Sequence, residues 1–179
     1  MTNFSYGARL NSFKLGLKDD EHKEQHLTIR LLKRAIEAGL TQMDLNYPDH
    51  FQGLSINELT QFISKQPINI NGLAMRYYTA PEFKLGAFTN PDPRIRTLAL
   101  DETKRGLDMA SELGCSLMTL WMGQDGFDYS FQGEFAEMWD NTILAIQEVA
   151  DYDKTIDISI EYKPNEPRAF SLMPDVSTT

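Results

Sequence analysis

Cysteine is almost absent from this sequence of 179 residues, which contains a single one, Cys115. One cysteine cannot form an internal disulfide bond, and without histidines beside it a thiolate zinc site cannot be built. We therefore expect the chain to work in a reducing compartment, the cytoplasm. A free cysteine of this kind is typically a small buried residue, which is the setting we predict for Cys115.

Long hydrophobic runs are also lacking. Nowhere do eighteen apolar residues follow one another, and residues 1–10 hold no apolar segment behind a basic start. These two absences predict neither a membrane-spanning helix nor a secretory signal. Glycine-rich phosphate loops of the two common types are missing as well, so the sequence gives no support for nucleotide binding.

Basic residues are outnumbered, with 17 Lys and Arg against 26 Asp and Glu, which gives a formal net charge of −9. Affinity for nucleic acid comes largely from clustered Lys and Arg that neutralise phosphates. We therefore expect no nucleic-acid partner. The hydrophobic fraction of 41% and the charged fraction of 24% are those of an ordinary globular protein.

Short apolar runs alternate along the chain with longer segments of helical period. This alternation predicts a parallel sheet with right-handed crossovers. No linker or low-complexity tract divides the chain, so we expect one domain spanning residues 1–179. The predicted strands are residues 4–10, 43–46, 73–77, 116–121 and 156–161, and the predicted helices are residues 27–36, 55–67, 95–114 and 135–149.

Two architectures fit five strands in strict alternation with four helices. One is an open, doubly wound sheet, and the other is a partial (β/α) barrel of the TIM type with about five parallel β/α units. In both, ligands bind where the parallel strands end at their carboxyl side. The polar and aromatic residues at those ends are Asn46, Asp49, His50, Arg76, Tyr77, Tyr78, Trp121, Asp125, Glu161 and Lys163.

Glu161 and Lys163 follow the last predicted strand and point to the same side, because strand side chains alternate. A carboxylate and an ammonium on one rim can bind a hard metal ion and polarise a substrate oxygen. The alternative is a salt bridge across the rim with no chemical role, since charge pairs at strand ends are often structural. The spacing alone leaves both interpretations open.

Residues 161–168, E-Y-K-P-N-E-P-R, resemble the E-x-K-P-N-E-P-R motif of xylose isomerases, which are metal-dependent sugar isomerases on a TIM barrel. Residues 86–96, which begin G-A-F-T-N, are similar to a second segment of that family. Residues 120–126, L-W-M-G-Q-D-G, are similar to its tryptophan-containing turn. The resemblance covers about residues 73–168 and favours the barrel over the doubly wound sheet.

The resemblance implies a monosaccharide substrate whose carbonyl moves between the first and second carbons by a hydride shift. It also implies a divalent metal, Mg, Mn or Co, with Glu161 as a ligand. Lys163 matches the lysine that hydrogen-bonds the carbonyl oxygen, and Trp121 and Tyr78 match two aromatic walls of the sugar pocket. Asp49 matches an aspartate that orients a ring-opening histidine.

The sequence departs from the family at two places. Asn46 stands where the ring-opening histidine is expected and cannot act as an acid or base near neutral pH. We take Asn46 as a substrate-binding residue and His50, four residues on, as the catalytic substitute for the histidine. In that family the other metal ligands follow strands six to eight. A complete eight-stranded barrel takes about 250 residues, whereas this sequence has 179. We therefore expect a chain truncated after strand five that binds metal weakly and has little or no isomerase activity alone.

Two alternatives to an isomerase remain. One is a non-catalytic partial barrel that binds sugar or serves assembly. The other is an endonuclease of the same superfamily, although such sites are rich in histidine and this chain has three. Strands at the open edges of a partial barrel invite association, so we also expect a homo-oligomer.

Overall fold

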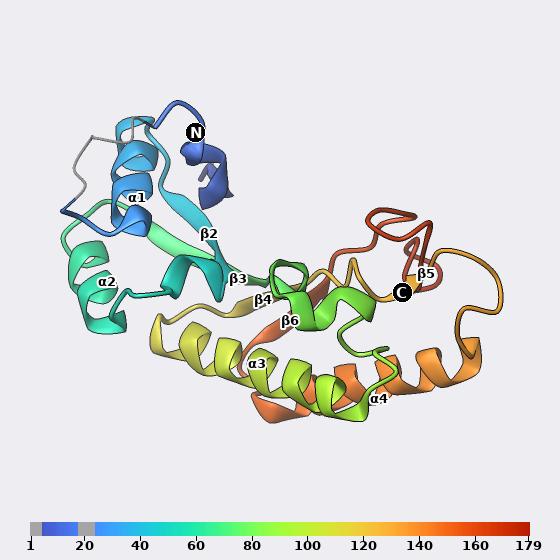
Figure 1. The fold of residues 1–179 in the computed structure, drawn as a ribbon. Coiled ribbons are helices and arrows are strands. Elements are labelled where there is room, and N and C mark those ends of the chain that lie inside the picture. Colours follow the sequence, from blue (N-terminus) through green and yellow to red (C-terminus); the bar gives the residue numbers. More distant parts are fainter. Residues whose placement is uncertain (1–4, 18–23) are drawn as a thin grey trace.

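The structure is a computed structural model that describes residues 5–17 and 24–179. Phe4, the first residue of the first predicted strand, lies outside these ranges. Figure 1 shows the elements, which in chain order are β1 (Gly7–Arg9), η1 (Leu10–Lys14), α1 (Leu27–Glu37), β2 (Gln42–Tyr47), η2 (Asp49–Phe51), α2 (Ile56–Ile63), β3 (Asn69–Met75), η3 (Tyr77–Thr79), η4 (Pro81–Leu85), α3 (Pro93–Glu112), β4 (Leu117–Leu120), β5 (Gly126–Phe127), α4 (Phe135–Tyr152), β6 (Asp157–Ile160) and β7 (Phe170–Ser171).

The main sheet has five parallel strands in the order β1-β2-β3-β4-β6. A doubly wound sheet reverses its strand order part-way across, which places helices on both faces. Here each strand lies beside its predecessor, and right-handed crossovers then place the connecting helices on one face. The strand order therefore decides for a partial barrel of the TIM type, as the sequence motifs favoured.

The sheet is also rolled. In a flat sheet of five strands the first and fifth are four strand spacings apart, or about 19 Å. An arginine and a glutamate side chain placed end to end are shorter than that. Nevertheless Arg9, at the end of β1, forms an ion pair with Glu161, the residue after β6. The two edge strands are thus brought towards each other across the concave face.

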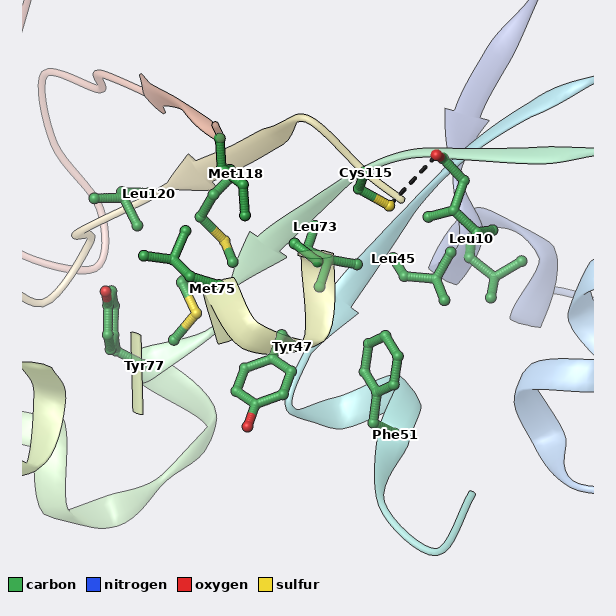
Figure 2. Packing of buried hydrophobic residues seen from close by; sticks show 14 of the residues in the cluster. Leu10, Leu45, Tyr47, Phe51, Leu73, Met75, Tyr77, Cys115, Met118 and Leu120 are labelled. Atoms are coloured by element: carbon green, nitrogen blue, oxygen red, sulfur yellow. Dashed lines mark hydrogen bonds between the residues drawn. The ribbon is translucent and has the colours of Figure 1, made fainter. Parts of the chain in front are cut away.

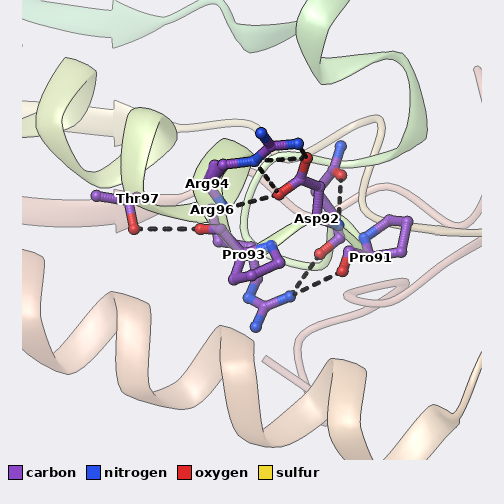
Figure 3. A network of polar contacts seen from close by, with 7 residues as sticks. Pro91, Asp92, Pro93, Arg94, Arg96 and Thr97 are labelled. Atoms are coloured by element: carbon purple, nitrogen blue, oxygen red, sulfur yellow. Dashed lines mark hydrogen bonds and ion pairs between the residues drawn. The ribbon is translucent and has the colours of Figure 1, made fainter.

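The helices begin where the sequence provides caps. Ser55 Oγ accepts a hydrogen bond from Glu58 N at 3.5 Å at the start of α2, as the capping-box pattern predicts. At the start of α3, Asp92 Oδ1 accepts from Arg94 N at 2.9 Å, and Pro93 occupies the first turn, where a missing N–H costs nothing (Figure 3).

The hydrophobic core lies between the sheet and the helices. Side chains that alternate along the strands face α1 and α3, and Leu45, Leu73 and Met118 among them are almost fully buried (Figure 2). Cys115 belongs to this core, where its Sγ donates to the Ile70 carbonyl oxygen at 3.4 Å. Burial raises the pKa of the Cys115 thiol to about 11, so it stays protonated at neutral pH.

The sequence prediction did not include the four short 3-10 helices η1 to η4, nor a two-stranded antiparallel sheet of β5 and β7. Gly126 in β5 has φ +153°, and a Cβ there would lie 2.1 Å from the Phe170 carbonyl oxygen. The approach of the two backbones therefore requires glycine. This small sheet fixes the segment after the family-like motif against the turn after β4.

In the part of the chain that the structure describes, no helix combines the length and the apolar content needed to cross a lipid bilayer.

Candidate functional site

Three of the predicted site residues meet at the carboxyl ends of β3, β4 and β6. The rings of Tyr78 and Trp121 lie edge to face, with centroids 4.7 Å apart. Lys163 Nζ lies 5.6 Å from the centroid of the Trp121 ring. On the other side of the pair, the guanidinium carbon of Arg76 lies 4.3 Å from the centroid of the Tyr78 ring. We call these four residues the rim cluster.

Glu161 and Lys163 do not pair with each other, and each forms a salt bridge with a different residue. Glu161 pairs with Arg9 across the concave face, and Lys163 Nζ donates to Glu166 Oε2 at 2.9 Å. The Lys163 ammonium has three N–H donors, so two remain for other acceptors. The carboxylates of Glu161 and Glu166 are therefore each neutralised by a different cation, and Lys163 lies beside Trp121.

Asn46 and His50 are joined in a buried unit at the end of β2. The Asn46 backbone N–H donates to His50 Nδ1 at 2.9 Å, and the two residues are 2% and 3% exposed. Because Nδ1 accepts, the neutral ring carries its hydrogen on Nε2. Burial lowers the pKa of His50 to about 4, and the positive charges of Lys14 and Arg76 add to this effect. His50 is therefore neutral at physiological pH.

Two buried polar atoms of this unit lack a hydrogen-bond partner among the described residues, Asn46 Oδ1 and His50 Nε2. One is an acceptor and the other a donor. A buried polar group without a partner costs free energy, so each of these two atoms is suited to a hydrogen bond with a group from outside the described residues.

Asp49 lies beside the rim cluster rather than inside it. Its Oδ1 accepts from Thr79 Oγ1 at 3.1 Å. Both residues line a cavity of about 500 Å³ between the loops that follow β2 and β3. Arg76 lines the same cavity and is the residue that connects it to the rim cluster. The structure thus groups the predicted residues into a rim, a buried unit and a cavity wall.

The three family-like sequence segments are fastened together by two residues. Asp125, in the turn after β4, is 2% exposed, and its Oδ1 accepts from Ala87 N at 3.1 Å, Thr89 N at 2.7 Å and Thr89 Oγ1 at 2.7 Å. Burial raises its pKa despite these hydrogen bonds. Asp125 therefore supports the loop before α3. The sequence alone identifies Asp125 only as a candidate site residue at the end of a strand.

Arg168, the last residue of the 161–168 motif, has the same kind of role. Its guanidinium pairs with Asp128 at 2.6 Å and donates to the Gln124 carbonyl oxygen at 3.2 Å and the Lys84 carbonyl oxygen at 3.2 Å. Arg168 thus connects the end of the motif to backbone carbonyl groups of two other segments. Within the segment of residues 86–96, Arg96 donates to the Asn90 carbonyl oxygen at 2.7 Å (Figure 3).

A divalent metal does not fit the residues at the rim by themselves. Among the described residues, no group of three or more His, Cys, Asp or Glu side chains could hold an ion. The ligand expected from the family motif, Glu161, already faces the Arg9 guanidinium. A hard divalent cation needs about six oxygen ligands and usually more than one carboxylate.

Sequence comparison agrees with the motifs. The profile of the Xylose isomerase-like TIM barrel family matches residues 32–172. The chain belongs to this family. A xylose isomerase of Thermus thermophilus is 29% identical over 161 residues, which are 83% of this chain and 42% of that enzyme.

Solved structures show the same fold. D-psicose 3-epimerase of Clostridium cellulolyticum H10, solved with D-tagatose, superposes with a TM-score of 0.68 at 16% identity, over 94% of this chain and 55% of that one. The IolI protein, solved with a zinc atom, superposes with a TM-score of 0.57 at 14% identity, over 78% and 48% of the two chains. The chain therefore spans about half the length of these members of the xylose isomerase-like fold.

The sequence pattern did not identify Arg9 as a residue of the site. The sequence indicates its position at a strand end but not its partner. Arg9 is the last residue of β1, and the rule that strand ends carry function points to it. Its partner, however, lies 152 positions away. Only the rolling of the sheet brings Arg9 to Glu161.

Proposed function

We propose that this chain forms the sugar-binding part of an isomerase or epimerase, with an open-chain monosaccharide held at the carboxyl ends of β3, β4 and β6. The observation that carries the proposal is the rim cluster, in which two aromatic rings and a lysine from three different strand ends meet. Aromatic faces and an N–H donor beside them suit a carbohydrate, which has apolar C–H faces and polar edges. Family membership supports the same class of substrate.

In this proposal each residue has a limited task. Trp121 and Tyr78 cover the sugar and exclude water, which strengthens every charge interaction near the reacting carbons. Lys163 donates to the carbonyl oxygen through an N–H that Glu166 does not occupy. The ammonium stabilises the negative charge that develops on that oxygen during the reaction.

The residues of the β2 end take part in binding. Asp49 accepts a hydroxyl hydrogen, and Asn46 Oδ1 and His50 Nε2–H receive and donate one hydrogen bond each. His50 has a pKa of about 4 and Nδ1 already engaged, so in this proposal it acts as a neutral donor. It does not take up a proton near pH 7.

The proposal includes weak metal binding by the 179-residue chain alone, and therefore little or no turnover. The ion pair of Glu161 with Arg9 supports this, because a cation at Glu161 would first have to displace a guanidinium. The same observation favours the second candidate function, a sugar-binding module without catalysis. Measuring binding and turnover separately distinguishes the two.

The test uses the purified chain and three sugars, D-xylose, D-tagatose and D-psicose, with and without Mg²⁺, Mn²⁺ or Co²⁺. We expect calorimetry to detect sugar binding that Lys163→Met weakens about tenfold, as loss of a charged hydrogen-bond donor should. Lys104→Met is the matched control, because Lys104 pairs with Glu148 on α4, away from the rim.

Carbon NMR of the same mixtures reports turnover. Absence of binding to all three sugars would contradict the proposed function. Metal-dependent interconversion of an aldose and a ketose by the wild-type chain would instead overturn the expectation of inactivity while supporting the enzyme class.

A further inference from the structure

Arg76 follows β3 and has no assigned role in the proposed function, yet its surroundings are unusual. Its guanidinium stacks on Tyr78, and its Nε is buried without a hydrogen-bond partner. No side-chain hydrogen bond or ion pair joins Arg76 to another described residue. Burial lowers its pKa, while the carboxylates of Asp49 and Glu161 raise it from a distance.

The other cations of the rim are occupied. Arg9 pairs with Glu161 and Lys163 pairs with Glu166. A guanidinium offers five N–H donors in a rigid fork, and a half-buried one without acceptors forgoes the hydrogen bonds that water would give it. The Tyr78 ring, whose centroid lies 4.3 Å from the guanidinium carbon, restricts where the fork can lie. Arg76 is therefore oriented to receive a ligand with two neighbouring oxygens.

The cavity that Arg76 lines is large enough for such a ligand. Its volume of about 500 Å³ falls within the usual range for small-molecule sites. Asp49, paired with Thr79, offers a carboxylate acceptor in the same wall. The wall thus presents a donor fork and an acceptor together, which is what a pair of neighbouring hydroxyls requires.

The charges of the cavity select against anions. Its charged side chains are the cation Arg76 and the carboxylates of Asp49, Glu82 and Glu102. Glu102 is paired with Arg105, so the remaining charges sum to 1 − 2 = −1. A phosphate or carboxylate would meet these negative surroundings in a partly buried site, where repulsion is screened less than in water. A neutral sugar meets no such penalty.

We propose that Arg76 is a substrate-binding and specificity-determining residue, which donates to two adjacent oxygens of a neutral monosaccharide while Asp49 accepts from a neighbouring hydroxyl. This inference rests on the proposed function and adds to it a second contact region and a preference for unphosphorylated sugars. Arg76 is the link between that region and the aromatic walls.

The experiment measures sugar binding by calorimetry for the wild-type chain, Arg76→Met and Arg76→Lys. The ligands are D-tagatose, D-psicose and D-fructose 6-phosphate, with and without Mn²⁺. Methionine keeps an apolar contact with the Tyr78 ring but removes every donor. Arg94→Met is the matched control, because the Arg94 side chain is 87% exposed and pairs with Asp92 at the start of α3.

We expect Arg76→Met to weaken binding of the neutral sugars by about tenfold or more, Arg76→Lys to restore part of the loss, and Arg94→Met to match the wild type. The wild type should bind the sugar phosphate at least about tenfold more weakly than D-tagatose. Partial rescue by lysine would show that Arg76 acts by donating hydrogen bonds to the sugar rather than by supporting the fold.

Equal binding by wild type and Arg76→Met would overturn the inference and leave the proposed function standing. Tighter binding of the sugar phosphate would overturn the stated preference. If the wild type bound no neutral sugar at all, the proposed function itself would fail. Should Arg76→Met not fold, Arg76→Lys and the phosphate comparison still decide.

Discussion

At the scale of the residue, His50 shows how burial changes chemistry that the sequence suggests. A histidine near the end of a strand looks like an acid or base, but the pKa of His50 is lowered from 6.5 to about 4 by burial. Between pH 6.5 and about pH 4, His50 binds a proton in the unfolded chain but not in the folded chain. The unfolding free energy therefore falls as pH falls through this window.

We expect the wild-type chain to lose about 2 kcal/mol more unfolding free energy between pH 7 and pH 5 than His50→Gln. Glutamine keeps an acceptor for the Asn46 N–H and does not titrate. The raised pKa of Asp125 acts in the opposite direction, but equally in both proteins. Urea denaturation at the two pH values provides the measurement.

His26→Gln provides the comparison. The His26 side chain caps α1 rather than lying in the buried unit, and its positive charge is the smallest of the influences that lower the pKa of His50. This variant should therefore keep most of the pH dependence of the wild type. If His50→Gln and wild type lost the same stability, the burial of a neutral His50 would be refuted.

At the scale of the element, the small sheet of β5 and β7 depends on Gly126. An added Cβ would collide with the Phe170 carbonyl oxygen, and φ +153° is a conformation that other residues rarely adopt. We expect Gly126→Ala to lower the unfolding free energy by about 2–4 kcal/mol, because both strain and a backbone clash arise. Urea denaturation measures the loss.

Gly133→Ala is a suitable comparison in the neighbouring loop. Its Cβ would meet only the flexible Met138 side chain, at 3.2 Å, so we expect a change below about 1 kcal/mol. Equal effects of the two substitutions would mean that the contact between β5 and β7 contributes little.

At the scale of the whole molecule, the five-stranded sheet has two open edges, β1 and β6. Its concave face carries exposed polar residues of β6, Asp157 and Ser159. Unpaired strand edges favour pairing with another chain. We therefore predict that the purified 179-residue chain associates with itself, which sedimentation across a wide range of concentrations would detect.

A stable monomer at every concentration, with scattering that indicates a closed particle, would contradict this prediction. Partial reversal of the association in moderate salt would point to charged contacts between chains rather than to strand pairing, because ion pairs at a surface are screened by salt.

The sequence by itself determined the α-helices, the strands of the main sheet and the resemblance to the family. Local periodicity, the Ser55 cap and the motif of residues 161–168 placed four helices, five parallel strands and the residues at their ends, because these signals depend on neighbours within a few positions. Whether Asn46, Asp49, His50, Tyr78, Trp121, Glu161 and Lys163 act on a sugar stays a prediction.

The tertiary structure decided what those residues contact. The strand order excluded the doubly wound sheet. Glu161, the carboxylate expected to bind metal, forms an ion pair with Arg9 instead. Asp125 and Arg168 form hydrogen bonds that hold loops in place. Arg76, which looked like any strand-end cation, was left without an acceptor among the described residues. The reason is physical: such partners lie tens to more than a hundred positions apart, and only the rolling of the sheet, which no local pattern encodes, selects which side chains meet.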